Sequence, residues 1–188
     1  MKLRIIAGEL RGQRFDAPTG FTTHPMGDRI RTALFNKLGD ISGKRVLDPF
    51  AGSGAISFEA ISRGAFRAIA IERDRKAQLV IERNITELKL AEKVKLIKAN
   101  CRAWSENNPD KLYDIVICDP PYDDIKLSTI TMLATHLQPN GLMVLSQPGR
   151  ETAPSVSGVV VVDKSSYGDA ALIFYRKGAA EIAASFHV

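Results

Sequence analysis

Short apolar runs alternate with longer stretches of helical periodicity from residue 45 onward. A short apolar run is typical of a buried strand, and apolar positions three or four residues apart are typical of a helix with one buried face. The predicted strands lie at 45–48, 67–72, 94–97, 113–118, 142–145, 159–162 and 171–175. The predicted helices lie at 53–63, at 125–137 and, after the capping residue Asp74, across the apolar positions from Ala77 to Leu88.

Strands that alternate with helices indicate a parallel sheet that is covered by helices on both faces. The last two apolar runs have no helix between them, so they predict an antiparallel hairpin at the end of the sheet. We therefore expect an α/β fold of the Rossmann-like kind, with a seven-stranded, mostly parallel sheet and a C-terminal antiparallel hairpin. Ligands of such sheets bind beyond the carboxyl ends of the strands, near the point where the strand order reverses.

The residues before this alternation have a different pattern. Segments 3–7 and 13–15 predict a small hairpin, and the apolar positions of 29–38 predict a helix that packs on the sheet. We expect three parts: an N-terminal extension over 1–44, a ligand-binding domain over 45–177 and a tail over 178–188.

The positive charge of the chain is concentrated in its N-terminal extension. Residues 1–45 hold nine basic and four acidic residues, which account for the whole net charge of +5. Localised positive charge suits a surface that binds a polyanion, although a solvated basic extension would look the same.

Composition excludes several other classes of protein. With 45% hydrophobic and 25% charged residues, the chain is neither disordered, collagen-like nor a coiled coil. We expect no membrane-spanning segment and no secretory signal. Cys101 and Cys118 are too few for a disulfide framework or a four-ligand metal site, so we expect buried, reduced thiols, no metal and a cytoplasmic setting.

The first candidate site follows the first strand of the domain, in the segment 48–54, Asp-Pro-Phe-Ala-Gly-Ser-Gly. Gly52 and Gly54 permit a tight turn that brings backbone N–H groups close to a ligand at a helix N-terminus. Ser57 stands where a dinucleotide fingerprint has its third glycine, and Asp48 suits a positively charged amino group better than a pyrophosphate. A plain strand-to-helix turn is the alternative.

Two further positions fit a nucleoside. Glu72 ends the second strand, where an acid can accept hydrogen bonds from both ribose hydroxyls. Asn100 and Cys101 follow the third strand, and an Asn amide offers the donor and the acceptor that an adenine edge needs. Taken singly, each would more often be an ordinary surface or loop residue.

The segment 119–122, Asp-Pro-Pro-Tyr, directly follows a buried-looking strand and carries the most specific chemistry. Asp119 and the carbonyl of Pro120 can each accept one N–H of an amino group, which holds its nitrogen in place for attack on an electrophilic carbon. Tyr122 offers a ring on which a base can stack. A proline-rich turn that merely ends the strand is the alternative.

This ordered set resembles the S-adenosylmethionine-dependent methyltransferases that act on exocyclic and side-chain amines. The N-terminal segments 4–8, 11–12, 28–31 and 34–36 are similar to the opening of the RsmD family, which methylates the N2 amine of a guanine in 16S ribosomal RNA. The resemblance runs from about residue 3 to residue 177. One departure is Met26-Gly27, where the family usually has residues with hydroxyl groups.

The resemblance implies a role for each candidate residue. The catalytic residues would be Asp119, Pro120 and Tyr122. The S-adenosylmethionine-binding residues would be Asp48, Phe50, Gly52, Gly54, Glu72, Asn100, Cys101 and Asp119. The RNA-binding residues would be Arg4, Arg11, Arg14, Arg29 and Arg31, although the last two could instead form the solvated face of a helix.

The implied activity is methylation of the guanine(966) site by a monomer, with 16S RNA or a 30S assembly particle as substrate. Another amino-methyltransferase, acting on adenine N6 or on a protein glutamine, remains an alternative. A dehydrogenase is disfavoured by Ser57 and by the lack of a second catalytic domain. A non-catalytic RNA-binding module is disfavoured by the intact 119–122 segment.

Overall fold

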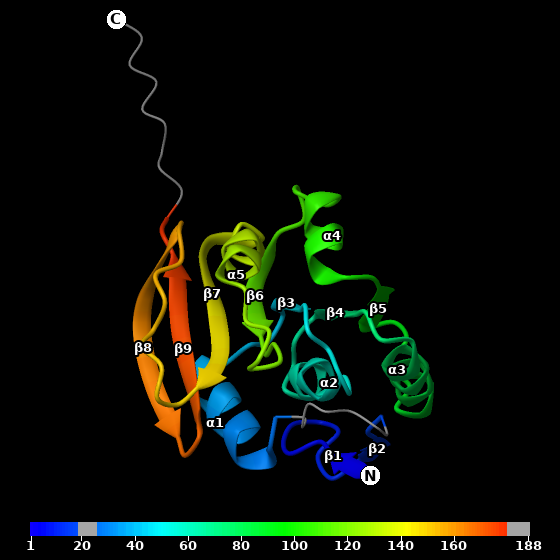
Figure 1. Ribbon diagram of the computed structural model, residues 1–188. Helices are drawn as coiled ribbons and strands as arrows, with labels where there is room; N and C mark the ends of the chain where they lie inside the picture. The colour runs from blue at the N-terminus through cyan, green and yellow to red at the C-terminus, as the bar shows by residue number, and fades with distance from the viewer. Residues whose placement is uncertain (19–25, 180–188) are drawn as a thin grey trace, which may run out of the picture.

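The computed structural model describes residues 1–18 and 26–179. Its main sheet has seven strands: β3 (Arg45–Asp48), β4 (Arg67–Glu72), β5 (Val94–Lys98), β6 (Tyr113–Cys118), β7 (Leu137–Pro148), β8 (Val159–Tyr167) and β9 (Ala170–Lys177). They are ordered β5-β4-β3-β6-β7-β9-β8 (Figure 1). Pairing is parallel from β5 through β7, and β9 is antiparallel to both β7 and β8. The predicted fold class is confirmed.

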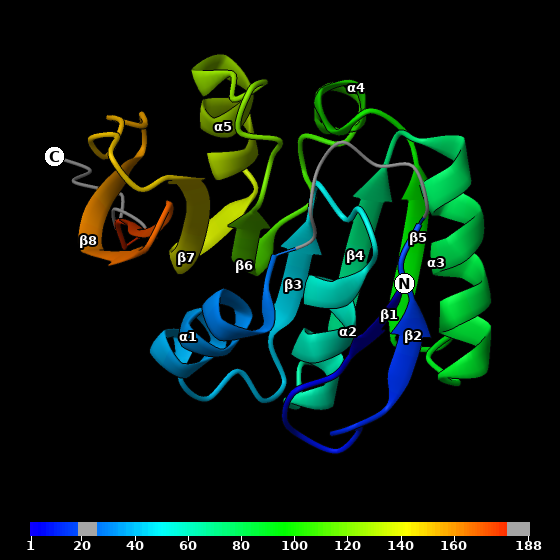
Figure 2. The same ribbon diagram turned by 60° about the horizontal axis from the view of Figure 1, so that its bottom comes forward.

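Helices cover both faces of this sheet, as Figure 2 shows. The helices are α1 (Asp28–Leu38), α2 (Ala55–Ser62), α3 (Arg75–Glu87), α4 (Cys101–Glu106) and α5 (Leu127–Ala134). Helices α1, α2 and α3 share one apolar core with the N-terminal residues, and α4 and α5 share a second core on the opposite face. The inner strands β4 and β6 are buried on both sides, which explains their apolar sequences, whereas the edge strands β5 and β8 are largely exposed.

Several elements differ from the sequence-based expectation: α5 is shorter than the helix predicted at 125–137, and β8 is longer than the strand predicted at 159–162. The two largest differences concern β7 and α4. Strand β7 begins at Leu137, so the Pro-Asn-Gly segment 139–141 lies inside the strand, where the pairing with β6 shifts register. Helix α4 was not predicted because six residues are too few to show periodicity. It starts where the Oδ1 of Asn100 accepts the N–H of Arg102 at 2.9 Å and of Ala103 at 3.4 Å.

The N-terminal residues form the expected hairpin, β1 (Lys2–Arg4) and β2 (Arg14–Asp16). The loop between these strands lies directly on the C-terminal end of α2: a Cβ built on Gly8 would lie 1.8 Å from the carbonyl oxygen of Ser62. Gly8 also has a φ of +85°, so only glycine fits this approach. Ile5 and Phe15 belong to the same core as α2, and the domain boundary at residue 44 stays a prediction.

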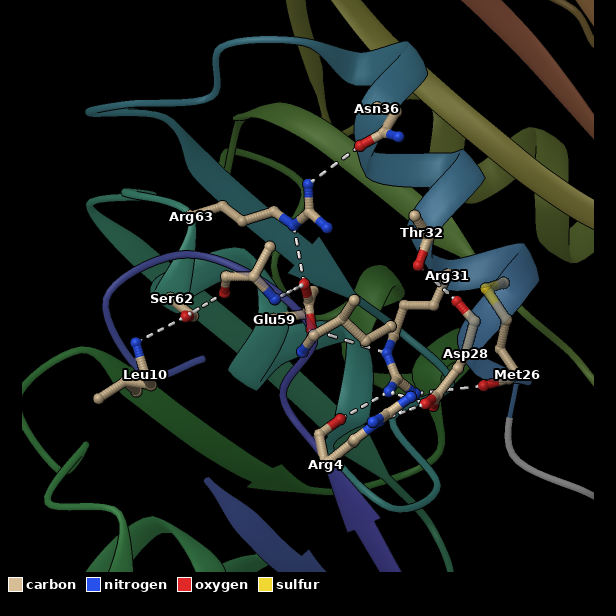
Figure 3. A network of polar contacts seen from close by, with 12 residues as sticks. Arg4, Leu10, Met26, Asp28, Arg31, Thr32, Asn36, Glu59, Ser62 and Arg63 are labelled. Carbon is tan, nitrogen blue, oxygen red and sulfur yellow. Dashed lines mark hydrogen bonds and ion pairs between the residues drawn. The ribbon is translucent and has the colours of Figure 1, made fainter. Parts of the chain in front are cut away.

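A buried carboxylate on α2 collects the contacts of this region (Figure 3). Glu59 is fully buried and accepts the backbone N–H groups of Ile6 at 2.8 Å and Ala7 at 3.1 Å. It pairs with Arg63 at 2.8 Å and lies 3.8 Å from the Nε of Arg31, which is itself fully buried. One side chain therefore joins the N-terminal loop, α1 and α2.

Arg31 extends the network to the first strand and the start of α1. Its guanidinium donates to the carbonyls of Arg4 at 2.8 Å and Met26 at 3.2 Å and to Asp28 at 3.0 Å (Figure 3). Burial lowers the pKa of Arg31, and the neighbouring carboxylates of Glu59 and Asp28 oppose that shift. Arg31 is a structural residue in this arrangement.

Two smaller expectations can be compared with the described residues. Both Cys101 and Cys118 are free and buried, as expected. Within the ranges 1–18 and 26–179, no helix has the length and apolar character that a membrane crossing requires.

We predict that Glu59→Ala destabilises the protein by about 3–5 kcal/mol, because it removes one of the two carboxylates beside the buried guanidinium of Arg31 and leaves two backbone N–H groups without an acceptor. Glu59→Gln should cost less, since the amide oxygen still accepts a backbone N–H. Urea unfolding measures both, with Glu87→Ala on the exposed face of α3 as control. A loss for Glu59→Ala no larger than for that control would contradict the anchoring role.

Candidate active site

Four neighbouring strands end at one edge of the sheet, and the predicted site residues lie there. Asp48 ends β3 and Glu72 ends β4, while Asn100 and Asp119 follow β5 and β6. Strand β3 has β4 on one side and β6 on the other, so chain order reverses at this point (Figure 2). This is where open α/β sheets bind their ligands.

The turn after β3 depends on its glycines. Gly52 has a φ of +54° and Gly54 a φ of +82°. A Cβ on Gly54 would lie 2.6 Å from the ring of Phe58, so a larger residue cannot be accommodated without displacing that ring. The turn ends at the N-terminus of α2, where backbone N–H groups have no partner within the helix.

The carboxylate of Glu72 links the glycine turn after β3 to the turn after β4. Its Oε2 accepts the N–H of Gly52 at 2.7 Å, and its Oε1 accepts the N–H of Asp74 at 2.8 Å. Its backbone carbonyl accepts the amide of Gln78 at 2.8 Å, which orients the end of the strand. Each carboxylate oxygen can accept a second hydrogen bond, so Glu72 keeps capacity for two ribose hydroxyls.

Asp48 is fully buried, and only one of its oxygens has a partner in the described residues. Oδ2 accepts the hydroxyl of Ser57 at 2.7 Å, whereas Oδ1 has no hydrogen-bond partner there. Burial raises the pKa of Asp48 to about 7, the Ser57 hydrogen bond opposes that shift, and the charges of Asp119 and Glu72 add to it. A buried carboxylate oxygen without a donor indicates a place for a ligand donor or a proton.

The turn 119–122 has one carbonyl that is used within the protein and one that is not. The carbonyl of Pro121 accepts the N–H of Asp124 at 3.0 Å and closes the turn, whereas no hydrogen bond within the described residues uses the carbonyl of Pro120. Burial raises the pKa of Asp119 to about 6, and a hydrogen bond from Ser146 opposes the shift. Asp119 is therefore mostly ionised at neutral pH and can accept an N–H.

Tyr122 is partly exposed, and a hydrogen bond holds its hydroxyl group in place. The residue is 41% exposed, and its OH lies 2.8 Å from the Oγ of Ser146 on β7. Burial raises the pKa of Tyr122, so the phenol stays protonated. An exposed ring held at its far end is suited to stacking a base.

The remaining candidate cofactor-binding residues after β3 and β5 are Asn100, Cys101 and Phe50, and their surroundings differ. Asn100 uses its side-chain oxygen to cap α4, which leaves its amide nitrogen outside the cap. Cys101 is buried in the core on the α4 face, and Phe50 packs partly buried against the same core. Their contact with a cofactor stays a prediction.

The arginines divide into two groups. Arg4, Arg11, Arg14 and Arg29 are exposed. Arg31 is fully buried in the Glu59 network, so the expectation that it binds RNA is wrong: its donors already serve the protein.

Sequence reasoning did not identify Ser57 and Ser146 as site residues, although their hydroxyls lie beside Asp48 and Asp119. The available signal was a polar residue where the pattern demands an apolar one, in the first turn of a buried helix and in a buried strand. In the ranges that the structure describes, no three His, Cys, Asp or Glu side chains are grouped as metal ligands.

A glycine turn after β3, a carboxylate at the end of β4 and the 119–122 turn lie together at the switch point of such a sheet, in agreement with the class to which the protein belongs, the S-adenosylmethionine-dependent methyltransferases. The cofactor fits these residues: it is a nucleoside with an ammonium and a sulfonium group, and Asp48 offers a buried, unpartnered oxygen. Glu72 would hold the ribose and the 49–54 turn the amino-acid part.

Comparison with known proteins identifies the family within that class. The chain belongs to the family described as Conserved hypothetical protein 95, whose model matches residues 3–176. The resemblance to the RsmD family is thereby confirmed.

Similar proteins cover most of the chain. Ribosomal RNA small subunit methyltransferase D of Buchnera aphidicola is 33% identical over 155 residues, 80% of this chain and 81% of that protein. The Escherichia coli protein of the same name is 36% identical over 122 residues, 64% of this chain and 61% of that protein. The solved structure of an Escherichia coli protein described as methyltransferase yhhF is 30% identical, with a TM-score of 0.84 over 95% of this chain and 99% of that one.

We predict that Glu72→Ala weakens S-adenosylmethionine binding by roughly ten- to a hundredfold, because hydrogen bonds to a charged acceptor are worth about 1.5–3 kcal/mol. Titration calorimetry measures the affinity. Glu72→Gln should retain part of it, and Glu87→Ala on the outer face of α3 should retain all of it. If Glu72→Ala binds the cofactor as tightly as the unmodified protein, Glu72 only braces the turn.

Proposed function

We propose that the protein transfers the methyl group of S-adenosylmethionine to the exocyclic N2 amine of a guanine in 16S ribosomal RNA, at the site that corresponds to guanine(966). The observation that carries this proposal is the 119–122 turn: an ionised carboxylate, an unused carbonyl and an exposed aromatic ring at the edge where the cofactor binds. The name shared by the relatives, ribosomal RNA small subunit methyltransferase D, supports the class of substrate.

When bound, the cofactor supplies a methyl group on a positively charged sulfur, which leaves as a neutral thioether when the amine attacks. The chain's own residues position the amine. Asp119 and the carbonyl of Pro120 each accept one N–H, which directs the nitrogen lone pair toward the methyl group and favours the positive charge that develops on nitrogen. One N–C bond forms, one S–C bond breaks and one proton leaves the nitrogen. Asp119, with a pKa of about 6, is a suitable acceptor for that proton.

Tyr122 selects a flat group beside the amine. A guanine that reaches this edge must be unstacked from its neighbours, and the exposed ring of Tyr122 replaces part of the lost stacking. The bond to Ser146 keeps the ring in one orientation, so little side-chain entropy is lost when the base binds.

The basic hairpin supplies contacts to the RNA backbone in this proposal. Arg11 and Arg14 are exposed and make no ion pair among the described residues, whereas Arg4 pairs with Asp28 at 2.8 Å. The loop around Gly8 lies at the C-terminal end of α2, and a helix of this length spans about 12 Å. In this proposal Arg11 contacts phosphates that flank the target base, not the base itself.

Asp119→Ala should lower turnover by at least about a hundredfold, a larger effect than on cofactor affinity, because its contact matters most at the reacting amine. Tyr122→Ala should raise the KM for RNA, and Tyr122→Phe should be mild because stacking needs only the ring. Transfer of a labelled methyl group to undermodified 30S particles, naked 16S RNA and DNA measures these effects. Digestion to nucleosides then identifies the product.

Two results of that assay would count against the proposal. Label in N6-methyladenosine or in DNA would favour another amino-methyltransferase. Unmodified turnover of Asp119→Ala would make the 119–122 turn structural.

The double change Arg11→Glu, Arg14→Glu should weaken RNA binding and reduce its salt dependence by about one unit of slope per lost phosphate contact. Cofactor affinity should not change, because both residues lie away from the carboxyl edge. Filter binding over a salt series measures the slope. The matched control is Lys93→Glu, Lys95→Glu, an equal change in charge at the start of β5. Equal losses in both double variants would show that only net charge matters and that the hairpin is not the docking surface.

A further inference from the structure

Three carboxylates lie at the carboxyl edge without a basic partner. Asp48, Glu72 and Asp119 form no ion pair with any Lys or Arg among the described residues. Arg73 directly follows Glu72 in the sequence, but its Nη1 lies 3.8 Å from the Oδ2 of Asp124. By contrast, the buried carboxylate of Glu59 has two basic neighbours, Arg31 and Arg63. The edge is therefore short of positive charge.

The lack of a positively charged neighbour is most pronounced at Asp48. Its side chain is fully buried, and its Oδ1 is unpartnered. The groups that face it are the Ser57 hydroxyl from α2, Glu72 from β4 and Asp119 beyond β6, and Cys118 in β6 lies near both aspartates. None of these groups carries positive charge, and burial raises the pKa of the Cys118 thiol as well, so that it stays protonated. A buried carboxylate in such surroundings is stabilised either by a proton or by a cation that arrives with a ligand.

The two ligands of a methyltransferase differ in that respect. S-adenosylmethionine has a positively charged sulfonium, and S-adenosylhomocysteine has a neutral thioether in its place, while their amino-acid and adenosine parts are identical. Any group that responds to charge at the sulfur position therefore distinguishes the donor from the product.

We propose that Asp48 and Asp119 act as one acidic unit that holds a proton in the free protein and releases it to solvent when the cationic donor binds. After methyl transfer the positive charge at sulfur is gone, the unit takes up a proton again, and the neutral product is held less tightly. The coupling gives the protein a means of exchanging product for donor by charge. It rests on the proposed methyl-transfer function, and it is independent of which base accepts the methyl group.

The hydroxyls beside the two carboxylates fit this role. A hydroxyl is both donor and acceptor, so the Ser57 hydroxyl can donate to the ionised form of Asp48 and accept from the protonated form without moving. Ser146 offers the same choice to Asp119. A Lys or Arg in either position would fix the carboxylate in its ionised form and abolish the response.

Titration calorimetry of the unmodified protein tests the coupling directly. Each ligand is titrated between about pH 5.5 and about pH 8, in two buffers of different ionisation enthalpy, so that the protons released are counted. Donor binding should release protons, and the ratio of donor to product affinity should rise by about tenfold across this range. Groups shared by the two ligands cancel in the ratio. Equal proton release and equal pH dependence for donor and product would overturn the proposal.

Asp48→Asn locates the effect, because the amide has the size of the carboxylate and cannot titrate. Its donor-to-product ratio should vary less with pH than that of the unmodified protein. Asp110→Asn, an exposed change in the loop before β6, is the matched control and should leave the ratio as it was. An unchanged pH response in Asp48→Asn would overturn the assignment to Asp48, and if this variant does not fold, the comparison in the unmodified protein decides.

The experiment uses no RNA, so its failure differs from a failure of the proposed function. A chain that binds donor and product without proton coupling would still be a methyltransferase. A chain that binds neither ligand at any pH would refute both the cofactor and the coupling.

Discussion

The arrangement of the N-terminal third of the molecule depends on the contacts that the Glu59 carboxylate makes. It faces the loop between β1 and β2, the buried guanidinium of Arg31 on α1, and Arg63 at the end of its own helix. A buried charge is costly unless each of its lone pairs is satisfied, and here backbone donors and guanidinium groups share that task. The geometry of the hairpin, α1 and α2 therefore follows from one side chain that would be unfavourable if any partner were displaced.

The carboxyl edge shows the opposite arrangement within the same domain. Asp48 is fully buried and Asp119 partly buried, neither has a basic partner among the described residues, and desolvation raises their pKa values to about 7 and about 6. Incomplete satisfaction of this kind lowers the stability of the ligand-free protein and raises its affinity for a cationic ligand. The contrast between Glu59 and Asp48 separates a carboxylate that holds the fold together from one that belongs to the site.

Sequence patterns predicted the fold closely because its inner strands are buried on both faces. The strands at 67–72 and 113–118 have the predicted ends, since a polar or turn residue interrupts each apolar run there. Pattern reasoning failed for α4, which is too short for periodicity, and for the start of β7, whose register shift with β6 depends on the partner strand.

For the site, Asp48, Glu72 and Asp119 could be located at strand ends from the sequence alone. The role of Arg31 could not, because its partner Glu59 lies 28 positions away and its burial is a property of the assembled fold. The same is true of Ser57 and Ser146, whose hydroxyls become relevant only once the carboxylates are beside them. Local chemistry is readable from a sequence, whereas the pairing of distant polar groups is not.

The position of the hairpin also sets an order of events during synthesis. Ile6 and Ala7 bind a residue more than 50 positions later, and Asp16 exchanges two hydrogen bonds with Asn84, 68 positions later. Chains fold as they emerge from the ribosome, and a segment cannot dock before its partner has been made. Residues 2–16 therefore leave the ribosome before their partners and acquire their structure only after α3 has emerged, so a segment that is translated early is ordered late.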